Sequence, residues 1–90
     1  MESPHEYTLS DIRRVGEEAE GLARSAAWQR AVAMTQARIF EEWTRASVPS
    51  IREELHAEMR AFERLQDSLL TLIEDGLVAG VSLDQDPSQD

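Results

Sequence analysis

The stretch "RASVPSIREE", Arg45 to Glu54, divides the chain into its main helical segments. Pro49 is disfavoured inside a helix but suits the first turn of one, because its missing N–H would have no partner there. Ser47 can cap ahead of it, and Ser50 with Glu53 also has the spacing of a capping box. One helix therefore ends near Arg45, and another begins near Pro49.

Apolar residues recur at helical spacing on both sides of this break. The upstream stripe predicts a helix over about 26–45, and the downstream stripe predicts a helix over about 49–75, with Gly76 as its stop. A link this short makes the two helices antiparallel neighbours. Their shared apolar seam, the expected core, comprises Trp28, Val32, Ile39, Trp43, Leu55, Met59, Phe62, Leu65 and Leu69.

A third, weaker stripe precedes them and predicts a helix over about 9–24. Ser10 is a plausible N-cap, and Gly16 and Gly21 each cost a helix interior about 1 kcal/mol relative to alanine. The apolar register fails after Ala26, within "RSAAW", where Ser25 can cap a fresh helix. A single bent helix is the alternative to this break.

The expected fold is all-α: an antiparallel helical hairpin (about 26–45 and 49–75) with a shorter N-terminal helix (about 9–24), assembling into a larger helical bundle. Residues 1–8 read as a flexible lead-in and 9–76 as one helical domain. Residues 77–90 read as a C-terminal extension. Leu77 and Val78 would fold back on the preceding helix, and the chain would be disordered from about 84.

Composition narrows the classes of function. The 90 residues carry a net charge of -9, which disfavours nucleic acid and anionic membrane as partners and favours a basic protein surface. There is no cysteine to form a disulfide, and no apolar run is long enough to span a bilayer. The acidic N-terminus does not resemble a secretory signal. A cytoplasmic location is expected, or a virion if the chain is viral.

Glu53 and His56 have the Glu-x-x-His spacing of di-iron helical bundles. On a helical wheel, however, both point away from the apolar stripe, whereas di-iron ligands point into the core. A dimer could still gather these side chains with Glu41 and Glu42 at an interface. A solvated helix face is the preferred interpretation, so neither metal nor cofactor is expected.

Glu58 lies near the centre of the same apolar stripe. Either it pairs with Arg38 or Arg45 and fixes the register of the two helices, or it sits at the stripe edge and reaches water. Gln66 is also near the core face. Both alternatives stay open at the level of sequence.

A second, smaller apolar strip comprises Ala33, Ala37 and Phe40, on the side of its helix opposite the main seam. A helix with two apolar faces has two neighbours, so this strip predicts contact with a second subunit or another protein. No nucleophile–base arrangement or phosphate-binding loop is present in the sequence. Neither catalysis nor a small-molecule substrate is expected.

The segments "SAAWQRAV", "IFEEW" and "IREELHAEMRAFERLQDSLLTLIEDG" cover roughly residues 25–76. Their order resembles that of small helical proteins encoded among the structural genes of tailed bacteriophages and prophages. That family carries no catalytic motif to transfer. The resemblance implies a virion or head-morphogenesis component that works through protein contacts.

Three functions follow as hypotheses. The leading one is a non-enzymatic structural or interaction protein that self-associates or docks on a larger assembly. The alternative is an acidic inhibitor, or nucleic-acid-mimicking decoy, that binds a basic surface through Glu53, Glu63, Asp67, Glu74 and Asp75. The third is the dimeric Glu-x-x-His metal site.

Overall fold

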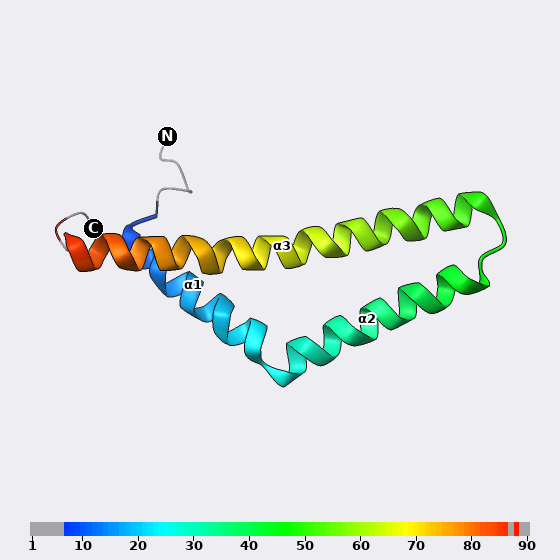
Figure 1. The fold of residues 1–90 in the computed structure, drawn as a ribbon, viewed down its shortest axis with the longest axis horizontal. Helices are drawn as coiled ribbons and strands as arrows, with labels where there is room; N and C mark the ends of the chain where they lie inside the picture. The colour runs from blue at the N-terminus through cyan, green and yellow to red at the C-terminus, as the bar shows by residue number, and fades with distance from the viewer. Residues whose placement is uncertain (1–6, 87, 89–90) are drawn as a thin grey trace. The chain divides into compact units, whose positions relative to one another are not determined.

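The computed structural model describes residues 7–86 and 88, which form three helices (Figure 1). These are α1 (Leu9–Arg24), α2 (Ala26–Arg45) and α3 (Pro49–Gln85). The all-α prediction is confirmed, as are the bounds expected for the first two helices. Within the described residues, none of the helices is long and apolar enough to cross a membrane.

The break between α1 and α2 is real, so the alternative of a single bent helix is wrong. Ser25 has an extended backbone, and its Oγ accepts a hydrogen bond of 3.1 Å from the N–H of Trp28. This is the geometry of an N-cap, which satisfies one of the donors left free in the first turn of a helix. A single local hydroxyl therefore marks the start of α2.

The break between α2 and α3 lies where Pro49 predicts it, but it is capped differently. Val48 holds the N-cap position, and its carbonyl accepts hydrogen bonds from Ile51 (3.1 Å) and Arg52 (3.2 Å). The caps expected from Ser47 and Ser50 are not formed in the described part of the chain. The fixed φ of proline starts the helix without a side-chain cap.

The expected stop at Gly76 is wrong, because α3 continues to Gln85. A glycine stop requires positive φ, and no glycine among the described residues has it. At about 1.5 Å per residue, the 37 residues of α3 extend about 55 Å. Leu77 and Val78 are helical and exposed, and do not fold back.

The structure describes part of each end of the chain. Tyr7 and Thr8 precede α1, while residues 1–6 of the expected lead-in lie outside the described residues. At the other end, Asp84 and Gln85 are the last residues of α3. Residues 87, 89 and 90 of the expected disordered end also lie outside the described residues.

The chain divides into two compact units. Unit 1 combines Met1–Leu22 with Leu69–Asp90, so it contains most of α1 and the last part of α3. Unit 2 is Ala23–Ser68, with α2 and the first part of α3. The long α3 contributes to both units because the boundary between Ser68 and Leu69 falls within it.

The expected apolar seam is only partly a core. Ile39 and Leu55 are buried, at 4% and 7% exposure. Leu65 is 56% exposed, and its assignment to the core is wrong. At about 100° per residue, Leu65 lies about 80° from Leu55 around α3, whereas the half-buried Gln66 lies about 20° away. The remaining seam residues are half-buried: Trp28, Val32, Trp43, Met59, Phe62 and Leu69.

Candidate protein-interaction surfaces

In unit 1, α1 crosses the last part of α3 at two glycines. A Cβ built on Gly16 would lie 2.7 Å from the Cα of Gly76 and 2.8 Å from the carbonyl oxygen of Leu72. The buried Ala19 and Ala79, at 5% and 2% exposure, also present only small side chains. Helix separation depends on the side chains at the contact, so here the two backbones touch.

The crossing is antiparallel and opens a groove on each side. On α1, and likewise on α3, the residues that line one groove lie on one side of the crossing. The residues that line the other groove lie on the opposite side. The first, here called the Ile12 groove, has a volume of about 550 Å³. Its lining residues are Tyr7, Leu9, Asp11, Ile12, Val15, Leu72, Asp75, Val78, Ala79 and Ser82. Most of these are apolar, with acids interspersed.

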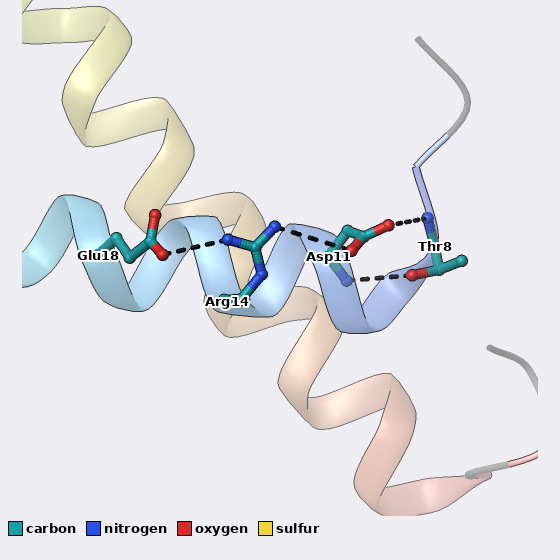
Figure 2. Close-up of polar contacts among 4 residues, drawn as sticks. All are labelled: Thr8, Asp11, Arg14 and Glu18. Atoms are coloured by element: carbon teal, nitrogen blue, oxygen red, sulfur yellow. Dashed lines mark hydrogen bonds and ion pairs between the residues drawn. The ribbon is translucent and has the colours of Figure 1, made fainter. Parts of the chain in front are cut away.

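The start of α1 is fixed at the mouth of the Ile12 groove by a reciprocal cap (Figure 2). Asp11 N–H donates to Thr8 Oγ1 at 3.1 Å, and Thr8 N–H donates to Asp11 Oδ2 at 3.4 Å. The expectation that Ser10 is the cap is therefore wrong, because α1 begins at Leu9. Tyr7 and Ile12 occupy the positions of a hydrophobic staple around this cap, and both line the groove.

Unit 1 is strongly acidic. Its described residues contain eight acids and two arginines, which gives a net charge of -6. Arg14 lies between Asp11 (3.8 Å) and Glu18 (3.1 Å), as Figure 2 shows. Arg13 contacts Glu17 at 3.2 Å and Asp84 at 4.0 Å. Both arginines are thus already engaged with acids of the same unit.

Asp75 differs from these acids, because it lines the Ile12 groove and makes no ion pair within the described residues. It is exposed, so water solvates its charge in the structure. A carboxylate beside an apolar groove, in a unit with excess negative charge, favours cationic groups at the rim of that groove. The groove therefore combines an apolar floor with an acidic edge.

In unit 2, Arg52 links the turn between α2 and α3 to an aromatic side chain. Its Nε donates to the carbonyl of Ala46 at 2.7 Å, and its guanidinium lies 5.4 Å from the centroid of the Trp43 ring. The ring of His56 lies 6.3 Å from that of Trp43, tilted by 49°. These contacts hold the turn, and the sequence pattern did not indicate them.

The expected interaction strip of Ala33, Ala37 and Phe40 is exposed along its whole length. Phe40 is 67% exposed and the adjacent Met34 is 56% exposed. We call these four residues the Phe40 face. Phe40 also lines a shallow hollow of about 230 Å³ over the buried Ile39. Unit 2 contains seven acids and seven arginines, so its net charge is zero with histidine neutral.

The other candidate residues lie on the outer surface. Those of the acidic hypothesis, Glu53, Glu63, Asp67, Glu74 and Asp75, are all exposed. Glu53 and His56 line a second shallow hollow with Arg52 and Arg60, two cations that oppose a metal ion there. Across the described part of the chain, no three His, Asp or Glu side chains gather as a metal-ligand group.

The structure distinguishes the two placements of Glu58 that the sequence allows. Glu58 is exposed and forms no ion pair with Arg38 or Arg45 within the described residues. Arg45 instead contacts Glu41, one turn earlier in α2, at 2.7 Å. The alternative in which Glu58 reaches water is therefore correct, so Glu58 does not fix the register of α2 against α3 through a buried ion pair.

The chain matches no protein-family model, and comparison with curated proteins and with solved structures gives no match. Its chemistry is that of two apolar surfaces with different electrostatics. The Ile12 groove lies in the acidic unit 1, and the Phe40 face lies in the electroneutral unit 2. Side chains of this kind can bind another apolar surface.

Proposed function

We propose that this is a non-enzymatic interaction protein that self-associates or docks on a larger protein assembly. The observation that carries the proposal is the imbalance between its core and its surface. Four hydrophobic residues among those described are buried, Ala19, Ile39, Leu55 and Ala79, and two of these are alanines. Twelve large apolar side chains are between 43% and 67% exposed. Association would remove such surface from water.

The energetic reason is the free energy of burying apolar area, roughly 25 cal/mol per Å². Single exposed apolar side chains are ordinary in small proteins, but a contiguous apolar face marks an interaction site. The Phe40 face is contiguous, because its residues recur at the spacing of one side of α2. In the proposed assembly, α2 and the first part of α3 form an antiparallel hairpin whose Phe40 face packs in a larger bundle.

The proposed partner is a second copy of the chain, another protein, or both. The resemblance of residues 25–76 to helical proteins of tailed phages supports a virion or head-morphogenesis setting. A cellular protein in the cytoplasm would use the same surfaces. Neither setting requires catalysis, a cofactor or a small-molecule substrate, and the proposal includes none of them.

The direct test is the mass in solution, measured by light scattering on a sizing column at several concentrations and at two salt levels. Self-association through an electroneutral apolar face predicts a discrete oligomer that persists at high salt, because apolar contact is not screened. A monomer at every concentration would leave only docking on a different protein.

The acidic decoy is the second candidate, and the charge of unit 1 favours it. Glu74 and Asp75 lie in the unit with a net charge of -6. Glu53, Glu63 and Asp67 lie instead in unit 2, where seven arginines balance seven acids. A decoy of this kind predicts association with a basic protein that weakens steeply with salt. An affinity for that protein that does not change with salt would eliminate it.

A further inference from the structure

We infer that the Ile12 groove binds a basic amphipathic helix of a partner protein. The partner helix would present one apolar stripe to the groove and carry arginine or lysine beside that stripe. This inference rests on the proposed function, because it assigns protein docking to one defined surface. It adds the chemistry of the occupant and separates that surface from the Phe40 face.

The geometry of the groove favours a helix as its occupant. Its walls come from two antiparallel helices, and its volume is about 550 Å³. Tyr7 and Val78 in its walls stay 62% and 67% exposed, so a small molecule there would remain in contact with water. Small-ligand sites usually enclose most of their ligand. An amphipathic helix instead inserts a few apolar anchors into an open groove.

The two walls of the groove supply apolar contacts for such anchors. Ile12 and Val15 lie three residues apart on α1 and are half-buried. Leu72 and Val78, on α3, are 43% and 67% exposed and form the facing wall. The partner's apolar side chains, spaced by three or four residues, would lie between these two walls.

Charge determines which helix fits best. Asp11 and Asp75 line the groove, and the described residues of unit 1 have a net charge of -6. A partner with arginine or lysine beside its apolar stripe would place cations near Asp75, which has no ion pair in the described part of the chain. Opposite charges at an interface speed association and exclude like-charged competitors.

The same argument disfavours a second copy of this unit in the groove. Two copies of unit 1 packed face to face would bring together two surfaces that each carry a net charge of -6. The electroneutral Phe40 face has no such penalty. Self-association through the Phe40 face and docking of a basic helix in the Ile12 groove can therefore occur on the same chain.

The test uses the full-length chain and two labelled synthetic helical peptides with the same leucine stripe. One peptide carries arginines beside the stripe, and the other carries glutamates at the same positions. Binding is followed by fluorescence anisotropy at low and high salt. The arginine peptide should bind at least about tenfold more tightly than the glutamate peptide at low salt, and the difference should shrink at high salt.

Two variants locate the binding site, each with a matched control on the same helix. Val78→Ser removes an apolar wall and should weaken the arginine peptide about tenfold, whereas Val81→Ser alters the other groove and should not. Asp75→Asn should weaken it about twofold to fivefold at low salt. Glu74→Gln removes the same charge outside both grooves and should have less effect.

Equal binding of the two peptides would overturn the inference, as would a loss of affinity with Val81→Ser but not with Val78→Ser. A fall in oligomer mass with Val78→Ser would show instead that a second copy occupies the groove. Repeating the peptide titration with the Phe40→Ala variant separates binding in the Ile12 groove from self-association through the Phe40 face. A monomeric Phe40→Ala chain that still binds the arginine peptide supports the groove independently of self-association.

Discussion

Gly16 and Gly76 approach so closely that neither position has room for a methyl group. A Cβ on Gly76 would lie 2.7 Å from the Cα of Gly16, which is the same distance as for the reciprocal substitution. The obstructing atoms belong to backbones, and these cannot rotate away as a side chain can. The close approach of α1 to α3, beside which the Ile12 groove opens, therefore depends on two glycines 60 positions apart in the sequence, and both of them line the other groove of the crossing.

Gly16→Ala should destabilise the fold even though alanine favours a helix. Alanine gains about 1 kcal/mol of helix propensity at either glycine of α1. At Gly16, the clash with Gly76 adds an overpacking cost of about 1–3 kcal/mol. At Gly21, a Cβ meets nothing within 4 Å, so Gly21→Ala is the matched control. The two midpoints of thermal unfolding, followed by circular dichroism, should differ by several degrees.

The same comparison can be made on α3. Gly80→Ala places its Cβ 3.7 Å from Arg13 Nε, an ordinary contact, so it should be tolerated, while Gly76→Ala should not. If Gly16→Ala and Gly76→Ala stabilise the protein as much as their controls do, the helices do not cross at these glycines.

Thr8→Ala should lower the free energy of unfolding by about 1 kcal/mol, because the N–H of Asp11 loses its acceptor at the start of α1. Thr8→Ser keeps the hydroxyl and should retain most of the stability. Amide exchange in the first turn of α1 reports the effect locally. Equal exchange in Thr8→Ala and the wild type would show that the cap contributes nothing.

The sequence predicts those structural features whose physical cause lies within one helical turn of the residue concerned. Ser25 and Pro49 mark helix starts through their own chemistry, so those bounds could be read without the structure. Gly16 and Gly76, considered singly, do not indicate a helix crossing, because each alone predicts a weakened helix or a helix stop. Their role depends on each other. No local pattern reveals that pairing, so the Ile12 groove could not be predicted.

Two intermediate cases show where the pattern was ambiguous. The strip of Ala33, Ala37 and Phe40 was noticed because it is visible in the spacing alone, and these residues are exposed, whereas Met34 was added to the Phe40 face from its exposure in the structure. Leu65 was placed in the core as a member of the apolar stripe of its helix, yet at about 100° per residue Gln66 lies nearer the direction of Leu55 than Leu65 does. Gln66, which the sequence also placed near the core face, is half-buried.

Arg52→Ala should destabilise the turn between α2 and α3 by about 0.5–1.5 kcal/mol, because it removes the hydrogen bond to Ala46 and the stacking on Trp43. Arg52→Lys keeps the charge but loses the planar fork, so it should recover only part of that stability. Arg60→Ala removes a nearby exposed arginine as the control. Denaturant unfolding measures the loss, and equal effects at the two arginines would contradict a specific role for Arg52.

Phe40 and Phe62 are the two phenylalanines of the chain and provide a matched pair. Phe62 is half-buried, so Phe62→Ala should cost about 2 kcal/mol of stability, less than the about 3–5 kcal/mol of a fully buried phenylalanine. Phe40 is 67% exposed, so Phe40→Ala should leave the stability of the isolated chain nearly unchanged. Unfolding at low protein concentration measures both changes.

For association, we expect the opposite order: Phe40→Ala should have the larger effect and Phe62→Ala the smaller. If the Phe40 face is the self-association surface, Phe40→Ala should shift the light-scattering mass toward that of the monomer at concentrations where the wild type is oligomeric. Phe62→Ala should keep the oligomer under conditions where the chain stays folded. An oligomer that survives Phe40→Ala unchanged would move self-association to another surface. If Phe62→Ala alone abolished the oligomer, Phe62 would lie in the subunit contact. Exposure in the isolated chain would then not identify the phenylalanine that becomes buried on assembly.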